Sequence, residues 1–415
     1  MWQDKEVENF KGRTWEWLKT VEDKFIPKLP EPLRSKVRKE IRKLREMVME
    51  AREPRIAIVG RRGAGKSTLI NAIFGRSVAE VGPVKGRTGM GKWFDYEDKQ
   101  GKMSILDTRG LGEGSSPDEL TEKESAEEEI KAAIDRKCPD AILFLCKAKE
   151  VDARIDEDLT GLLGIKSAIK RKHGYEAPVV GVITQVDELD PPMVAPPYDD
   201  LEKERNIRQA KAVLSKKLEK EEFGDVVEVI PVSAYMKFGD DGKIVHDQRW
   251  HIDILVEYLV DHLPRSAQLE LARTVQFKTV QRSMARKMIL GAAAAAGAVG
   301  AQPIPLADMP FITGIQIGLI IVIGYISGRE MSKKAAIEFM AAMGLNVSAA
   351  FGLRELARAL IKIIPVFGNA VSGLIAGAST YAVGEAAIAY FIDNKRTAEV
   401  KTVFKKELGK RQNET

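Results

Sequence analysis

One short stretch of the sequence has the composition and spacing of a phosphate-binding loop. It runs from Ile58 to Leu69, reads IVGRRGAGKSTL and matches G-x-x-x-x-G-K-[ST]. Glycines let the backbone curl so that its N–H groups face phosphate oxygens, and the helix that follows adds the positive end of its dipole. Lys66 would then reach the outer phosphates, and the Ser67 hydroxyl would bind Mg²⁺. The predicted phosphate-binding residues are Gly60, Arg61, Arg62, Gly63, Ala64, Gly65, Lys66, Ser67 and Thr68.

The elements that must position this loop are visible as short apolar runs separated by helical segments. The runs are RIAIVG, KMSILD, AILFLC, PVVGVI and VVEVIPV, all between residues 54 and 265. Near-continuous apolar runs of this kind predict buried strands of a mostly parallel sheet with helices on both faces. Phosphates bind at the carboxyl ends of such strands, where this loop must lie. We therefore predict an α/β domain over residues 54–265.

Three further motifs follow predicted strands along the chain. They are DTRG at 107–110, TQVD at 184–187 and SA at Ser233 and Ala234. With the phosphate loop, this order resembles the P-loop GTPases of the translation-factor-related class, nearest to the Era-like and dynamin-like branches. The resemblance covers roughly half of the chain. It implies a Ras-like fold that hydrolyses GTP to GDP and phosphate with Mg²⁺.

The resemblance assigns roles to individual residues. Asp107 would hold Mg²⁺ through water, and the Gly110 N–H would sense the γ-phosphate. Asp187 would bind guanine, because a carboxylate can accept from both N1–H and the exocyclic amine of guanine, whereas adenine has no such pair of donors. The base site would be completed by Thr184, Gln185, Ser233 and Ala234. Gln185 stands where the family carries lysine, which predicts weaker or faster-exchanging guanine binding.

Hydrolysis would need groups beyond those that bind the nucleotide. Leu111 follows the DTRG motif where small signalling GTPases carry the glutamine that orients water. Thr88, in KGRTGMG, is the predicted first-switch residue that reaches Mg²⁺ and water. Arg62 occupies a loop position that acts in hydrolysis in dynamin-like proteins. Two interpretations stay open: a self-supplied arginine finger, ordered when two such domains meet, or a solvent-facing arginine that raises phosphate affinity. The predicted catalytic residues are Lys66, Arg62, Thr88 and Gly110.

Residues 1–53 predict a helical hairpin, broken by the prolines of IPKLPEPL. Its first arm carries an apolar stripe that must pack on another surface. The stripe consists of Phe10, Trp15, Leu18, Val21 and Phe25. The second arm, LRSKVRKEIRKLREMVMEAR, is densely basic. A charged run is usually a solvated face, and lipid headgroups or RNA are the functional alternatives.

Residues 266–415 form the hydrophobic part of the chain. Met309–Gly328 and Ile363–Gly384 contain no charged residue and reach the length of about 20 residues that spans a bilayer. G-x-x-x-G spacings in both stretches allow close helix packing. A membrane hairpin and a water-soluble bundle both fit. The tail resembles a C-terminal domain of unknown function appended to Era-like GTPases, and the overall layout resembles immunity-related GTPases. That layout implies nucleotide-dependent dimers at membranes and an N-terminal hairpin packed on the tail in one all-α domain.

Composition limits the remaining possibilities. The chain has 415 residues, a formal net charge of +5 and two cysteines, which argue for a cytoplasmic protein without disulfides. We expect it at the membrane surface if the tail contacts lipid. The expected partners are guanine nucleotide, a second copy through the GTPase domains and membrane lipid. No DNA partner is expected, and the tail has no recognisable RNA-binding module. The favoured function is a GTP-hydrolysing switch at a membrane; the alternative is a soluble GTPase whose helical domain recruits protein or RNA.

Overall fold

The structure is a computed structural model. It describes residues 19, 21–78, 92–98, 101–108, 128–152, 155–219, 227–275, 277–301, 309–330, 332–343 and 373–413. The chain divides into two compact units. We call the first the α/β unit (Glu53–Ala267 with Thr274–Gln276) and the second the helical unit, which combines residues up to Arg52 with Gln268–Arg273 and Phe277–Thr415.

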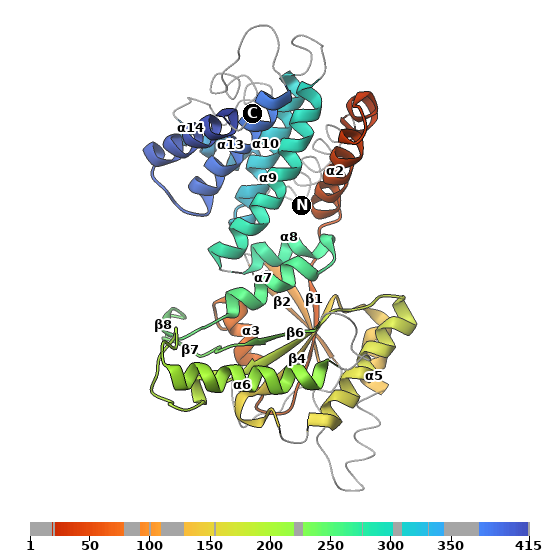
Figure 1. Ribbon diagram of the computed structural model, residues 1–415, viewed down its shortest axis with the longest axis vertical. Coiled ribbons are helices and arrows are strands. Elements are labelled where there is room, and N and C mark those ends of the chain that lie inside the picture. The colour runs from red at the N-terminus through yellow and green to blue at the C-terminus, as the bar shows by residue number, and fades with distance from the viewer. Residues whose placement is uncertain are drawn as a thin grey trace. The chain divides into compact units, whose positions relative to one another are not determined.

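A six-stranded sheet forms the centre of the α/β unit (Figure 1). Its strands are β1 (Arg55–Val59), β2 (Lys92–Asp98), β3 (Gly101–Asp107), β4 (Ala141–Lys147), β5 (Val179–Thr184) and β6 (Val227–Pro231). The spatial order is β2-β3-β1-β4-β5-β6, and only β2 pairs in the antiparallel direction. The predicted mostly parallel α/β fold is confirmed. Strand β2 was not predicted, because its residues KWFDYED are mostly polar and it lies at the edge of the sheet.

The other elements of the α/β unit lie between these strands or follow the last of them along the chain. The helices are α3 (Lys66–Phe74), one over 128–136, α5 (Ile155–His173), α6 (Leu201–Leu218) and α7 (Ile252–His262). The shorter elements are η3 (Ala148–Glu150), η4 (Val186–Glu188) and the hairpin of β7 (Met236–Phe238) and β8 (Ile244–Asp247). Helix α8 (Arg265–Thr274) contributes residues to both units. Strands β4 and β5 are buried almost throughout, so the main core lies on the central strands. Strands β1, β3 and β5 end at the carboxyl edge of the sheet, where Gly60, Thr108 and Gln185 follow them.

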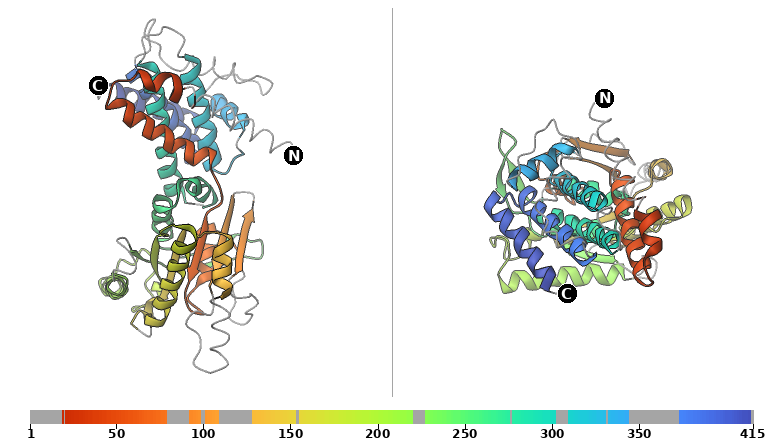
Figure 2. Two further views of the ribbon diagram at one scale, coloured as in Figure 1. Left: turned by 90° about the vertical axis from the view of Figure 1, so that its right-hand side faces the viewer. Right: turned by 90° about the horizontal axis from the view of Figure 1, so that it is seen from above.

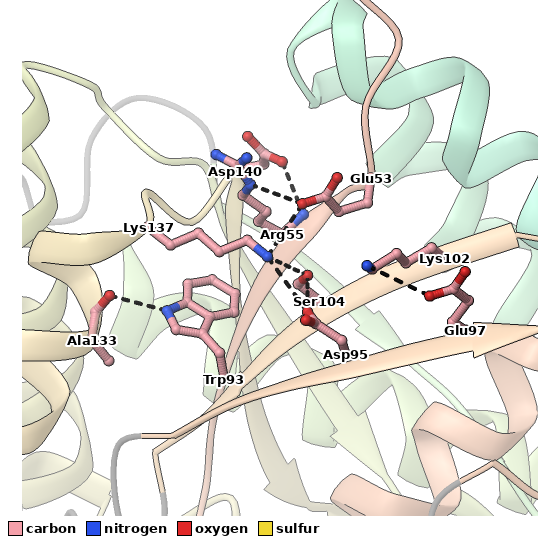
Figure 3. Close-up of polar contacts among 10 residues, drawn as sticks. All are labelled: Glu53, Arg55, Trp93, Asp95, Glu97, Lys102, Ser104, Ala133, Lys137 and Asp140. Carbon is pink, nitrogen blue, oxygen red and sulfur yellow. Dashed lines mark hydrogen bonds and ion pairs between the residues drawn. The ribbon is translucent and has the colours of Figure 1, made fainter. Parts of the chain in front are cut away.

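A polar cluster holds the opposite, amino-terminal end of the sheet together (Figure 3). The Lys137 Nζ atom donates to the Ser104 hydroxyl and lies 3.2 Å from Glu53 Oε1 and 3.5 Å from Asp95 Oδ1. Its ammonium group also lies 5.3 Å from the centre of the Trp93 ring. The pKa of Asp95 is lowered, chiefly by the hydrogen bond from Ser104. Lys137 therefore fastens the end of the 128–136 helix to the β2–β3 hairpin.

The helical unit joins the two ends of the described chain. It contains η1 (Val21–Phe25), η2 (Ile26–Lys28), α2 (Leu33–Met49), α9 (Lys278–Gly300), α10 (Met309–Ile326), α11 (Lys333–Ala342), α13 (Gly373–Phe391) and α14 (Thr397–Asn413). Helix α2 packs on α9, and the Phe25 and Phe311 rings meet edge to face at 5.2 Å. Helices α2 and α14 lie on opposite sides of α9, α10 and α13 (Figure 2). The predicted all-α part built from N- and C-terminal segments is confirmed, while Phe10, Trp15 and Leu18 lie outside the described residues.

Small residues allow α9 and α13 to approach closely. A Cβ atom on Gly377 would lie 3.3 Å from the Ala293 carbonyl oxygen, and one on Gly384 would lie 2.4 Å from Ile289 Cγ1. The predicted close packing at the Gly373–Gly377 pair is therefore present, with Gly297 of α9 as the facing residue. Backbone-to-backbone contact of this kind leaves no room for a larger side chain.

The apolar helices are largely covered by the rest of the helical unit. Most described side chains of α10 are buried, on all sides of the helix. Gln316 Nε2 donates to Thr380 Oγ1 of α13 at 3.1 Å. Among the described residues one helix, Gly373–Phe391, is long and apolar enough to cross a membrane, and 67% of its most apolar window is buried. Much of the predicted Ile363–Gly384 stretch lies outside the described residues.

We predict that Gly384→Ala destabilises the helical unit by about 1–3 kcal/mol, because the new methyl group overlaps Ile289 in a closely packed interface. Scanning calorimetry of the full chain would show the earlier unfolding. Gly409→Ala on α14 is the matched control, since a Cβ there meets nothing within 4 Å; we expect it to be neutral or to stabilise by up to roughly 1 kcal/mol. Equal effects of the two substitutions would contradict the packing described for α9 and α13.

Candidate functional site

The phosphate loop connects β1 to α3 in a conformation that depends on its glycines. Gly63 and Gly65 have φ angles of +78° and +83°, in the left-handed region that favours glycine. A Cβ on Gly60 would lie 2.7 Å from the Leu145 carbonyl oxygen of β4. The two motif glycines, Gly60 and Gly65, and the further loop glycine Gly63 are thus required by backbone geometry. Gly65 directly precedes the first turn of α3, so the N-terminus of that helix opens onto the loop.

Lys66 and its neighbours line the inside of this loop. The Lys66 side chain is only 8% exposed, and its Nζ atom donates to the carbonyl oxygens of Gly60 and, at 3.1 Å, of Arg61. Ser67 and Thr68 follow in the first turn of α3 and are half-buried. The lysine is therefore held across the loop by backbone carbonyls.

The two arginines of the loop have different surroundings. Arg61 Nε donates to Asp158 Oδ2 on α5 at 2.8 Å, and the Asp158 carboxylate is largely buried. Burial raises the pKa of Asp158, and the Arg61 charge partly opposes this shift. Arg62 is exposed. Asp158 was not predicted from the sequence, because nothing local in α5 indicates a partner almost a hundred positions away.

The last residue of β5 and the residue after it connect the predicted base site to the phosphate loop. Thr184 Oγ1 donates to the Ala64 carbonyl oxygen at 3.0 Å, and Gln185 Nε2 donates to the Gly63 carbonyl oxygen at 3.0 Å. Gln185 has a φ angle of +58°, which turns the chain into η4, where Asp187 lies half-buried. The two loops are thus tied together by two side chains of the TQVD motif.

The SA motif lies beside the turn that carries Asp187. The Val232 N–H donates to the Ile183 carbonyl oxygen at 2.7 Å, which extends the pairing of β6 with β5. Ser233 is fully buried and exchanges backbone hydrogen bonds with Trp250, and Ala234 is nearly buried beside it. The structure therefore brings Ser233 and Ala234 to the carboxyl edge of the sheet, next to the TQVD turn.

The end of β3 supplies the acidic residue of the site. Asp107 pairs in register with Ile58 of β1 and is 9% exposed. Thr108 Oγ1 and N both donate to the Ile58 carbonyl oxygen, at 3.0 and 3.3 Å. Gly110, Leu111 and Thr88 lie outside the described residues. Ser67 and Asp107 offer a hydroxyl and a carboxylate, which are the oxygen ligands that Mg²⁺ prefers.

Some residues near the site carry no motif signal in the sequence. Lys147, at the end of β4, places its Nζ atom 3.4 Å from where a Cβ of Gly63 would be, and it pairs with Glu150 at 3.0 Å. Lys203, in the first turn of α6, is fully buried against the turn that carries Asp187. A charged residue directly after a buried strand was the available hint for Lys147; Lys203 lies in an ordinary charged helix pattern.

Comparison with known proteins identifies both parts of the chain. Residues 55–183 match the protein family described as 50S ribosome-binding GTPase. They are a P-loop GTPase domain. Residues 265–413 match a domain of unknown function, DUF697. These two matches confirm the predicted GTPase resemblance and the predicted hydrophobic tail domain.

Individual relatives cover only parts of the chain. GTPase Der from Bacillus mycoides is 30% identical over 143 residues, which is 33% of this chain and 28% of that protein. The chain thus spans less than a third of the length of this curated relative. A Toc33 structure from Arabidopsis thaliana, a dimerization-deficient mutant, aligns over 60% of this chain and 95% of that chain with 18% identity and a TM-score of 0.36. A variant of Era from Aquifex aeolicus bound to GDP and AlF4⁻ aligns over 58% and 66%, with 24% identity and a TM-score of 0.33.

We predict that Gln185→Ala accelerates GDP release by about two- to tenfold, because the hydrogen bond that holds the base loop to Gly63 is lost. Gln185→Lys should slow release, since an ammonium group of suitable reach would make a charge-assisted bond to the same carbonyl. Stopped-flow displacement of a fluorescent GDP analogue measures both rates. Identical release from the wild type and the two variants would contradict a role for this bond.

Proposed function

We propose that the chain binds GTP with Mg²⁺ and hydrolyses it to GDP and phosphate. The observation that carries this proposal is the hydrogen bond from Gln185 Nε2 to the Gly63 carbonyl oxygen. It joins the loop that would bind the base to the loop that would bind the phosphates. In this site Lys66 and the N–H groups of residues 60–68 bind the phosphates. Asp187 accepts from guanine, with Thr184, Ser233 and Ala234 supporting its loop.

The proposed Mg²⁺ site uses oxygen ligands from three parts of the chain. Ser67 would bind Mg²⁺ through its hydroxyl, and Asp107 through a bound water, with Thr88 as the third protein contact. In the part of the chain that the structure describes, no group of three His, Cys, Asp or Glu side chains could hold a metal. Few protein ligands are the usual situation for Mg²⁺, which takes the rest from phosphate and water. When bound there, Mg²⁺ would neutralise negative charge on the outer phosphates.

The groups that act in hydrolysis are Lys66, Arg62, Thr88 and Gly110. Lys66 draws charge from the outer phosphates, and Gly110 contributes its N–H to the γ-phosphate. Arg62 is an exposed residue of the phosphate loop itself, and its guanidinium would stabilise the charge that develops on the bridging oxygen. We assign it the role of an arginine finger that is ordered when two GTPase domains meet. Exposure supports this assignment, because a finger must be able to reach its site.

We predict that Lys66→Met loses both GTP binding and hydrolysis, while Arg62→Ala keeps GDP affinity within about threefold and loses about 10³-fold in turnover. Phosphate release under saturating GTP and Mg²⁺, together with GDP titration, separates the two effects. Lys216→Met on the exposed side of α6 is the control and should match the wild type. Unchanged turnover of Arg62→Ala, with weaker nucleotide binding, would mean that this arginine only attracts phosphate.

The helical unit gives the nucleotide cycle its effect, and we propose that it does so at an anionic membrane surface. Helix α2 turns four exposed cations away from its buried side: Lys36, Arg38, Lys39 and Arg42. Its buried residues Val37 and Ile41 face the rest of the helical unit. Each cation near an anionic lipid surface contributes about 1 kcal/mol of binding. The rival function, recruitment of a soluble protein or RNA partner, is favoured by the burial of α10 and α13 inside the unit.

We predict that the full chain floats with vesicles that contain phosphatidylserine when it holds a non-hydrolysable GTP analogue, and less with GDP. Combined Lys36→Gln, Arg38→Gln, Lys39→Gln and Arg42→Gln should abolish flotation, and so should raised salt, because the attraction is electrostatic. Vesicles of phosphatidylcholine alone are the matched control. A chain that stays soluble and monodisperse with every vesicle and both nucleotides would favour the soluble-partner function instead.

A further inference from the structure

Lys203 is a buried cation placed directly behind the residue that would read the base. It lies in the first turn of α6, and its side chain has no measurable exposure. Its Nζ atom donates to the Asp187 carbonyl oxygen at 2.7 Å, to that of Leu189 at close range and to that of Pro191 at 3.4 Å. One ammonium group therefore holds three backbone carbonyls of the turn that carries the Asp187 carboxylate.

Burying an ammonium group is unfavourable unless its protons are bonded. Burial lowers the pKa of Lys203, and the carboxylates of Asp187, Asp190 and Asp200 act in the opposite direction. An apolar side chain in the same space would leave the three carbonyl oxygens without their donor. Lys203 fits this position because its ammonium group can donate to three backbone carbonyl oxygens at once. The shape of the turn therefore depends on Lys203.

The backbone around Lys203 is itself fixed. Asp200 caps α6 by accepting from the Glu202 and Lys203 N–H groups at 3.0 and 2.9 Å. Three residues further along α6, Asn206 Nδ2 donates to the Asp190 carbonyl oxygen at 2.9 Å. The start of α6 thus presents two side chains to the same turn, one buried and one at the surface.

Aromatic packing connects this clamp to the SA motif. The Lys203 ammonium lies 5.2 Å from the centre of the buried Tyr198 ring, and that ring meets Trp250 edge to face at 5.0 Å. Trp250 in turn exchanges backbone hydrogen bonds with Ser233. The turn of Asp187 and the strand end of Ser233 are therefore held by one continuous set of contacts that passes through Lys203.

We propose that Lys203 is a positioning residue for base recognition, which sets the placement of the Asp187 carboxylate and hence the preference for guanine over bases that lack its exocyclic amine. This inference rests on the proposed function and adds to it a residue outside the four motifs. A displaced carboxylate cannot make both hydrogen bonds to guanine, because the two bonds require one placement. Loss of the bond to the exocyclic amine removes the preference for guanine.

The test compares GDP with inosine diphosphate, which has N1–H but no exocyclic amine. Affinities for both, with Mg²⁺, are measured by calorimetry for the wild-type full chain, Lys203→Met and Asn206→Ala, with Lys216→Met as the control on the same helix. We expect the ratio of GDP to inosine diphosphate affinity to fall by about tenfold in Lys203→Met and by about two- to threefold in Asn206→Ala. Asn206 is only partly buried, so its variant keeps the test decisive if Lys203→Met does not fold.

The outcomes separate this inference from the proposed function. A wild type that binds neither nucleotide overturns the proposed function, and this inference with it. A wild type that prefers GDP, with the same ratio in Lys203→Met and Asn206→Ala, overturns the role of Lys203 alone. Lower thermal stability with an unchanged ratio would mean that the clamp is only structural and would also overturn the inference.

Discussion

The proposed nucleotide site depends on the hydrogen bond between Gln185 and Gly63. This bond joins two loops that lie 122 positions apart in the sequence, and Thr184 reinforces it through the Ala64 carbonyl oxygen. The phosphate loop can accept these bonds because Gly63 and Gly65 adopt left-handed backbone angles. The central parallel strands bring both loops to one edge of the sheet, where nucleotide phosphates and base would lie on either side of the bond.

Buried charged side chains support the two loops that this bond joins. Lys203 holds the back of the base loop, and Asp158 holds Arg61 on the phosphate side. Both are charged side chains of helices, and both are buried where they bond to a loop of the site. At the other end of the sheet, Lys137 fastens the hairpin of β2 and β3 to the helix before β4. Asp107 is the last residue of β3 and pairs with Lys92 of β2, so the contacts of Lys137 with this hairpin also support the acidic residue of the site.

The sequence predicted the elements that depend on local pattern. The phosphate loop, the parallel strands and the motif residues after β3, β5 and β6 each combine a buried run with a fixed spacing. Lys203 and Asp158 could not be predicted in the same way, because a buried ion in a helix has the same local sequence as a solvated one. Lys137, just after the 128–136 helix, has no motif signal in the sequence either. Strand β2 was missed because edge strands tolerate charge. In the helical unit, glycine spacing predicted close packing, but composition does not distinguish a buried core helix from a membrane helix such as α13.

Calorimetric titration of the full chain with GDP and with ADP, both with Mg²⁺, tests the central claim that the two joined loops form a guanine nucleotide site. The Asp187 carboxylate would accept from paired donors that adenine does not have, so we expect GDP to bind at least about a hundredfold more tightly than ADP. Equal affinity for the two nucleotides would show that only the phosphates are recognised. Such a result would contradict base recognition by the TQVD turn and the importance of the Gln185–Gly63 bond that holds this turn in place.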